Sequence, residues 1–137
     1  MNRSEQMNGD PYWRFAQIVV GFAGVAYLLT GIALLFAPTW FFLAIGHFVP
    51  FNRHYEGDLG AFLIPLGIGL LVAARDPARN IWVIRVAALG SLLHVCNHIY
   101  DALFNSNPPG AITQIVLLLI LALLLSVVSI RIPGRYN

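Results

Sequence analysis

Four histidines and two aspartates stand near the ends of the hydrophobic segments of this chain. Ionisable groups near lipid are costly, about 2.5–3.5 kcal/mol each for Asp or Arg at a helix centre, so they are seldom kept without a partner. Imidazole and carboxylate groups together suit metals such as Zn, Cu and Fe. The sequence therefore indicates one place for chemistry, built from His47, His54, Asp58, His94, His98 and Asp101.

Four of the polar residues share one face of the third hydrophobic segment. At about 100° per residue, His94, Asn97, His98 and Asp101 fall within a sector of roughly 100° of a helix. Two histidines four residues apart on a helix present two nitrogens to one ion. The facing segment supplies His54 and Asp58 at the same spacing.

Antiparallel pairing of these two segments would bring both motifs to the same level. We therefore expect a divalent ion of Zn, Cu or Fe, or a polar ligand head, to be bound there. Haem held by His54 with His94 or His98 is a minor alternative. A purely structural polar network and proton handling are the other interpretations of the same residues. The expected metal ligands are His54, Asp58, His94, His98 and Asp101, with Asn97 and Gln114 orienting them from behind.

The composition fixes the class of protein that must position these residues. Of 137 residues, 58% are hydrophobic and only 10% are charged, with a mean hydropathy of +0.74. In soluble domains about a quarter of the residues are charged. We expect an all-α integral membrane protein in which residues 1–137 form a single domain within a lipid bilayer.

Four segments are long and apolar enough to span, and they predict an antiparallel four-transmembrane-helix bundle. The second is short and contains Pro65, so it is expected to start in the interfacial layer. We expect the first to be retained and not cleaved as a signal peptide. An aromatic segment, Trp40–Phe48, should lie in the interface after the first helix, as an anchor or a lid. The predicted helices cover about residues 15–36, 58–74, 81–104 and 111–130.

Arginine placement predicts the orientation, because cytoplasmic flanks collect positive charge. Of the eight arginines, only Arg53 lies at the end of the predicted bundle that carries the His/Asp cluster. The termini and the 75–80 turn are therefore expected to be cytoplasmic, and the site to face the extracytoplasmic side of the plasma membrane. No dense basic run is present, which argues against nucleic-acid binding, and the single Cys96 excludes an intramolecular disulfide. The opposite side carries Arg3, Arg14, Arg75, Arg79, Arg85, Arg131 and Arg135.

The motif Asn52-Arg-His-Tyr-Glu-Gly-Asp-Leu-Gly60, a glycine-rich apolar run, an arginine-bearing turn and His94-x-x-x-His98-x-x-Asp101 follow one another. This layout resembles a group of uncharacterised small bacterial four-helix membrane proteins that are loosely similar to the DoxX-like families. The resemblance implies a four-helix membrane bundle, and a few such relatives are linked to redox partners or quinone-connected enzymes. It assigns no role to an individual residue.

Two functions of different class follow. The first is a membrane protein whose outer His/Asp cluster binds a metal ion or a polar ligand. The second is a non-catalytic accessory or assembly subunit of a larger membrane complex, respiratory or redox in kind, with the cluster as a structural polar network. The expected protein partners are other membrane-protein subunits or further copies of this chain. The sequence marks no nucleophile elbow or phosphate loop, and we assign no catalytic residue and favour a non-enzyme.

Overall fold

Every regular element in the described part of the chain is a helix. A computed structural model describes residues 11–105 and 110–134. Arg3 and Arg135, which entered the orientation argument, and residues 106–109, part of a loop expected to be extracytoplasmic, lie outside these ranges. In chain order the elements are α2 (Pro11–Phe36), α3 (Pro38–Phe41), the short π-helix η1 (Phe42–Gly46), α4 (Arg53–Ala73), α5 (Ile81–Phe104) and α6 (Ala111–Arg131).

The four long helices, α2, α4, α5 and α6, are each long and apolar enough to cross a membrane. They confirm the expected helical fold with four candidate membrane spans. Large apolar side chains cover their outer surfaces; Phe62 is 76% exposed and Ile130 is 81% exposed. Such a surface is typical of helices that face lipid, because lipid tails and apolar side chains are equally hydrophobic.

The structure extends two helices beyond their predicted starts. α2 is described from Pro11. α4 begins at Arg53 and not near residue 58, because the Asn52 Oδ1 atom accepts hydrogen bonds from the backbone N–H of His54 at 3.0 Å and of Tyr55 at 3.4 Å. The His54 and Asp58 side chains are therefore carried on the first turns of a regular helix.

Glycines bring α2 and α4 into backbone contact. A Cβ atom added to Gly67 would lie 2.6 Å from the backbone nitrogen of Leu28, and one added to Gly60 would lie 2.7 Å from the carbonyl oxygen of Gly31. Small residues at a helix interface allow this close approach in membranes. The α2–α4 pair is thus the tightest contact of the fold, and a side chain at either glycine would break it.

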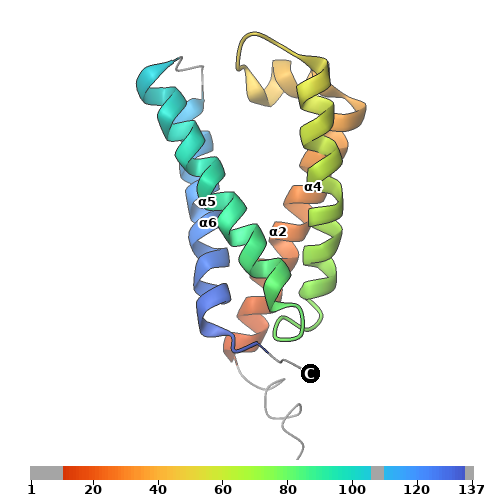
Figure 1. The fold of residues 1–137 in the computed structure, drawn as a ribbon, viewed down its shortest axis with the longest axis vertical. Helices are drawn as coiled ribbons and strands as arrows, with labels where there is room; N and C mark the ends of the chain where they lie inside the picture. The colour runs from red at the N-terminus through yellow and green to blue at the C-terminus, as the bar shows by residue number, and fades with distance from the viewer. Residues whose placement is uncertain (1–10, 106–109, 135–137) are drawn as a thin grey trace, which may run out of the picture.

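The second pair, α5 and α6, diverges from the first, so that the bundle is V-shaped (Figure 1). The pairs meet at the end that holds the turn between α4 and α5, here called the closed end, and separate towards the other, the open end. At the closed end the Tyr12 hydroxyl donates to the Val127 carbonyl at 3.2 Å, and Gln17 Nε2 donates to the Arg75 carbonyl at 3.2 Å. Buried side chains concentrate there, among them Trp13, Ala16, Val20, Leu70, Ile84, Leu125 and Val128.

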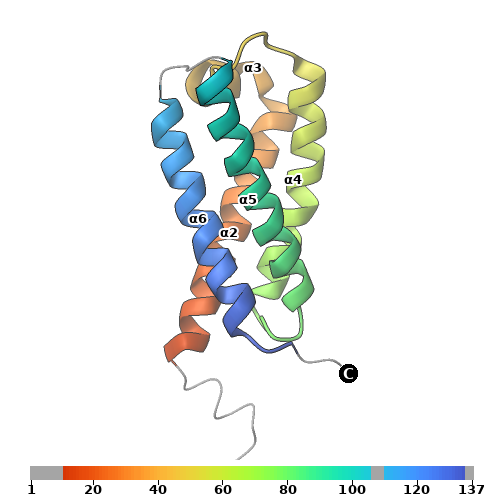
Figure 2. The same ribbon diagram turned by 60° about the vertical axis from the view of Figure 1, so that its left-hand side comes forward.

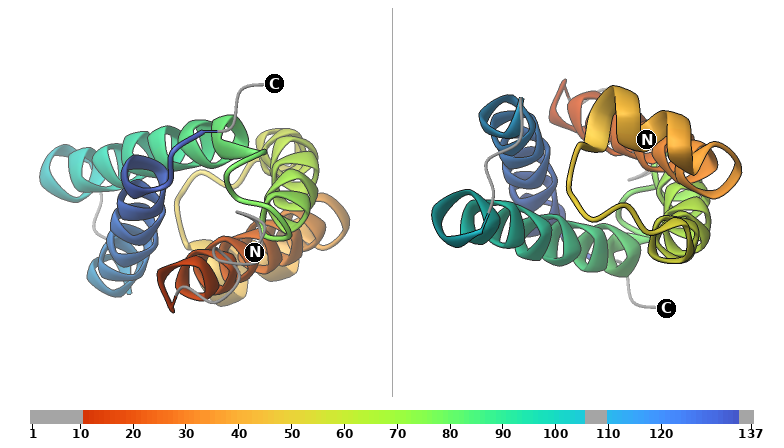
Figure 3. Two further views of the ribbon diagram at one scale, coloured as in Figure 1. Left: turned by 90° about the horizontal axis from the view of Figure 1, so that it is seen from below. Right: turned by 90° about the horizontal axis from the view of Figure 1, so that it is seen from above.

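Residues 38–48, here called the capping segment, cover the open end. α3 and η1 lie beside the outer ends of α2 and α4, while α5 stands between α6 and α4 when the bundle is turned (Figures 2 and 3). Gln114 Nε2 of α6 donates a hydrogen bond to the carbonyl oxygen of Ile45. The Phe48 ring meets the His98 ring edge-on, with centroids 5.2 Å apart. The expected aromatic segment is therefore partly helical, and it connects the two helix pairs.

One polar contact joins the two pairs in the middle of the bundle. The Tyr27 hydroxyl of α2 lies 2.5 Å from the Ser91 Oγ atom of α5, and Ser91 Oγ also donates to the Ala87 carbonyl at 2.7 Å. We expect Tyr27→Phe to lower the free energy of unfolding by about 0.6 kcal/mol, the typical value of an interhelical hydrogen bond in a bilayer. Unfolding by SDS titration in mixed micelles measures the loss.

The exposed Tyr100 supplies the matched control, Tyr100→Phe, which should leave stability unchanged. In a double-mutant cycle, Tyr27→Phe combined with Ser91→Ala should cost less than the sum of the single changes, since both remove the same bond. Strict additivity of the two substitutions would contradict the coupling.

Candidate functional site

Two of the predicted site histidines are in direct contact on α5. The Nε2 atoms of His94 and His98 are 2.9 Å apart, and their ring centroids are 4.7 Å apart. Their spacing of four residues places both rings on one side of the helix. A hydrogen bond between two imidazoles needs one donor and one acceptor nitrogen, so one of the two Nε2 atoms carries a lone pair.

The second ring nitrogen of His98 is enclosed. Its Nδ1 atom is buried and finds no hydrogen-bond partner within the described part of the chain, while Phe48 packs against the ring edge. A buried polar atom without a partner costs about 1–3 kcal/mol. His98 thus lies in ring contact with Phe48 of the capping segment, with its Nδ1 atom buried at a cost, and His94 is the histidine nearer the middle of the bundle.

Asp101 and Asn97 belong to a separate hydrogen-bonded chain further along α5. Asn97 Nδ2 donates to Asp101 Oδ2 at 3.3 Å, and Asn105 Nδ2 donates to Asp101 Oδ1 at 2.8 Å. The carboxylate is thus satisfied by two amide groups at the end of the helix. Asn97 retains its side-chain oxygen, a further acceptor.

His54 and Asp58 form a third group at the start of α4. His54 Nε2 lies 3.4 Å from Asp58 Oδ2, and the two side chains are 79% and 58% exposed. A pair so exposed contributes little to stability. Gln114, expected to orient the ligands, instead holds the Ile45 carbonyl of the capping segment.

The five expected metal ligands therefore do not form one cluster. Across residues 11–105 and 110–134, no group of three or more His, Cys, Asp or Glu side chains is placed to hold a metal ion. The physical reason is the V shape: α4 and α5 carry their polar residues at the open end, where the helix pairs separate (Figure 1). Binding of metal by the smaller His94–His98 pair stays a prediction.

A cavity of about 390 Å³ opens between the helix pairs beside His94. We call it the polar cavity. His94 and Asn97 of α5 supply two polar groups to its lining, and Tyr27 of α2 supplies a third. The remaining lining residues are apolar or glycine: Leu59, Leu63, Leu66 and Gly90.

Tyr27 was not among the residues predicted for the site. Its signal in the sequence was a hydroxyl in the middle of an apolar segment, which must find a partner when buried. The partner, Ser91, lies 64 positions further along the chain, so sequence spacing alone did not join them.

The class that these features define is a helical bundle with four helices long and apolar enough to span a membrane, and a polar cavity lined by three of them, α2, α4 and α5. Comparison of the chain with protein-family models, with curated proteins and with solved structures found no match. The likeness to DoxX-like proteins stays a prediction.

Proposed function

We propose that this chain is a multi-pass plasma-membrane protein that binds a small ligand by its polar head in the polar cavity, from the extracytoplasmic side. The observation that supports it is the lining itself: two hydrogen-bonding side chains, His94 and Asn97, stand on one wall of a cavity that is otherwise mostly apolar. Ligand sites are typically concave and apolar, with a few polar groups that fix orientation. His98 would support the position of the His94 ring through their 2.9 Å contact.

A metal ion at His94 and His98 is the other form of this proposal. Two nitrogens bound to one ion at ~2.0–2.1 Å stand about 2.9 Å apart at right angles and about 3.3 Å apart in the tetrahedral geometry of zinc, so the observed separation of 2.9 Å would have to widen slightly for zinc. Zn, Cu or Fe would complete its coordination with water or with atoms of a ligand. Haem held by His54 with His94 or His98 stays a prediction; the His94–His98 pair alone cannot hold it, because iron–nitrogen bonds of ~2 Å on both faces place the two nitrogens about 4 Å apart.

Histidine side-chain NMR tests the proposal in lipid nanodiscs. Protein labelled with ¹⁵N at histidine is titrated separately with monobutyrin, a short-chain molecule with a neutral hydroxyl head, and with Zn²⁺. We expect saturable shifts of the His94 imidazole signals and no shift at the exposed His54. A response to monobutyrin supports the polar-head form, and a response to Zn²⁺ supports the metal form.

The matched variants are His94→Leu and His54→Leu. His94→Leu should weaken monobutyrin binding about tenfold, the equivalent of one hydrogen bond of about 1.4 kcal/mol. His54→Leu should bind as the original chain does. If neither monobutyrin nor Zn²⁺ shifts the His94 signals, or if both variants bind monobutyrin equally well, the proposal is overturned and the accessory-subunit hypothesis is favoured.

A further inference from the structure

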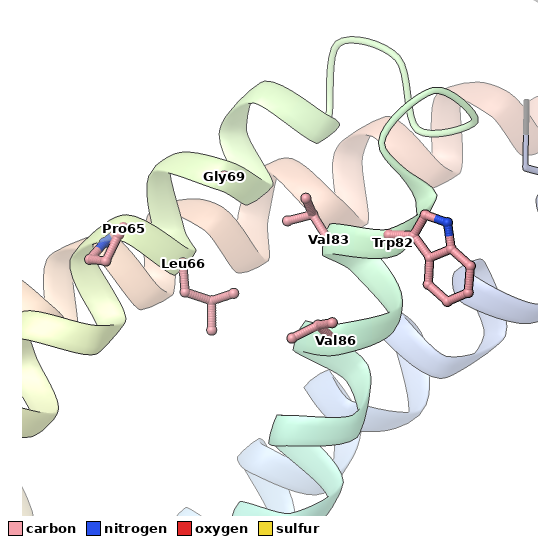
Figure 4. Close-up of a pocket in the computed structure, with 6 residues that line it drawn as sticks. All are labelled: Pro65, Leu66, Gly69, Trp82, Val83 and Val86. Carbon is pink, nitrogen blue, oxygen red and sulfur yellow. The ribbon is translucent and has the colours of Figure 1, made fainter. Parts of the chain in front are cut away.

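A second cavity lies between α4 and α5, next to the closed end. It has a volume of about 380 Å³, and we call it the apolar cavity. Figure 4 shows Leu66 and Val86 facing the space between the two helices. Apart from the indole N–H of Trp82, the side chains that line it are apolar. The lining consists of Pro65, Leu66 and Gly69 of α4 and of Trp82, Val83 and Val86 of α5.

The position of the apolar cavity along its two helices places it within one leaflet of a bilayer. Trp82 is the second residue of α5, and tryptophan is enriched at the membrane interface. Pro65, at the far end of the lining, is separated from Ala73, the last residue of α4, by about 12 Å of helix. One leaflet of the hydrocarbon core is about 15 Å deep. The cavity therefore begins near the interface at the closed end and stops short of the bilayer centre.

The apolar cavity is open to the surroundings of the bundle. Trp82 and Val86 are each 61% exposed, and they lie on a helix that is long and apolar enough to span a membrane. In a bilayer, lipid chains contact this side of the molecule, and a hollow that they left empty would forfeit dispersion contacts. An acyl chain is the occupant whose chemistry matches the lining.

Positive charge surrounds the interfacial end of the apolar cavity. The α4–α5 turn carries the exposed Arg75 and Arg79, the second of them three positions before Trp82. Arg85 adds a third cation, with its guanidinium carbon 5.0 Å from the centroid of the Trp82 ring. The acidic residue of the turn is Asp76, whose Oδ1 atom accepts a hydrogen bond from the Arg79 backbone N–H at 3.2 Å. The balance of charge at this end is positive, which favours an anionic head group.

Arginine is suited to a phosphate head group in particular. Its planar guanidinium binds phosphate oxygens through two parallel hydrogen bonds. The arginine distribution predicts that the closed end is cytoplasmic, and the cytoplasmic leaflet is the one that carries anionic lipids. Basic pockets between membrane helices on this side are typical sites for anionic lipid head groups.

We propose that the apolar cavity and the α4–α5 turn bind one anionic phospholipid, with its phosphate at Arg79 and one acyl chain in the cavity. The head group then lies at the interface and the chain points towards the bilayer centre, as in the lipids of the surrounding leaflet. The proposal does not depend on the ligand of the polar cavity, whose polar groups His94 and Asn97 lie further along α5.

Photolabelling in phosphatidylcholine nanodiscs tests this. Two probes, phosphatidylglycerol and phosphatidylcholine, carry the same diazirine midway along one acyl chain and are used separately at low mole fraction, and labelled peptides are mapped by mass spectrometry. We expect phosphatidylglycerol to label residues 65–69 and 82–86 about fivefold more than phosphatidylcholine does, the factor for one arginine near an anionic lipid. Excess unlabelled phosphatidylglycerol should suppress the difference, and both probes should label the exposed face of α6 equally.

Matched substitutions separate the head group from the chain. Arg79→Gln should remove the fivefold preference and Arg79→Lys should keep most of it, because lysine retains the charge. Arg14→Gln, which removes an exposed arginine of α2 at the same end, should leave the preference unchanged. Val86→Phe should lower the labelling of residues 65–69 by filling the cavity, whereas Val116→Phe, at an exposed position of α6, should not. Far-ultraviolet circular dichroism checks that each variant is folded.

Four results would each overturn the phospholipid site. Equal labelling by the two probes would mean that the head group is not recognised. Equal losses in Arg79→Gln and Arg14→Gln would show a general attraction of anionic lipid to the closed end. Equal labelling of residues 65–69 in Val86→Phe and Val116→Phe would place the chain elsewhere. Absence of label from residues 65–69 and 82–86 with both probes would mean that another helix, such as one of a second copy, covers the cavity.

The two proposals can fail independently, because their readouts are separate. The response of His94 to monobutyrin and Zn²⁺ tests the polar cavity, whereas the labelling of residues 65–69 and 82–86 tests the phospholipid site. Loss of the phosphatidylglycerol preference with an intact His94 response would remove the phospholipid site alone.

Discussion

Replacing Gly67 by alanine should destabilise the fold by about 1–3 kcal/mol, the usual cost of forcing an extra methyl group into a packed interface. The added Cβ would lie 2.6 Å from the Leu28 nitrogen and 2.9 Å from the Gly24 carbonyl oxygen. Both are backbone atoms of α2, so no side chain can rotate away. The helices must move apart, and the loss spreads along the whole α2–α4 contact.

Gly90→Ala is the matched control, because a Cβ atom there meets nothing within 4 Å. Alanine is a better helix former than glycine by about 1 kcal/mol, so this variant should be unchanged or slightly more stable. SDS titration in mixed micelles, followed by far-ultraviolet circular dichroism, measures both. Gly60→Ala, which meets the Gly31 carbonyl at 2.7 Å, should resemble Gly67→Ala. Equal stability of the Gly67 and Gly90 variants would contradict the close helix contact.

The helices themselves were predictable because they depend on local properties of the sequence. Length and hydropathy located the four helices that are long and apolar enough to span a membrane. The largest error, at the start of α4, came from Asn52, whose side chain caps two backbone N–H groups and starts the helix early. Such a cap is a short-range signal, and the sequence contains it, but it lies in a polar stretch outside the apolar run.

The contact between His94 and His98 was also predictable, since helical spacing alone brings them together. The distance from these histidines to His54 and Asp58 was not predictable, because it depends on the angle between the two helix pairs. Glycines fix α2 against α4, and the closed end joins α5 and α6 to them, but neither feature sets how far the open ends separate. Periodicity gives the level and the face of a residue, whereas the distance across the bundle comes from packing.

The orientation of the bundle gives a second prediction with a large expected effect. The closed end carries Arg14, Arg75, Arg79 and Arg131 at helix ends or in the α4–α5 turn, and the open end carries Arg53. By the positive-inside rule the closed end should be cytoplasmic. In a Cys96→Ser background, Tyr55→Cys should react with a membrane-impermeant maleimide in intact cells, and Pro133→Cys should react only after permeabilisation.

These two positions suit the test because both are exposed and neither is an arginine. Tyr55 is 71% exposed near the start of α4, and Pro133 is exposed just after the end of α6, so the charge bias stays as it is. Labelling of Pro133→Cys in intact cells with protection of Tyr55→Cys would reverse the assignment. The polar cavity would then open towards the cytoplasmic leaflet, and its ligand would have to be supplied from that side.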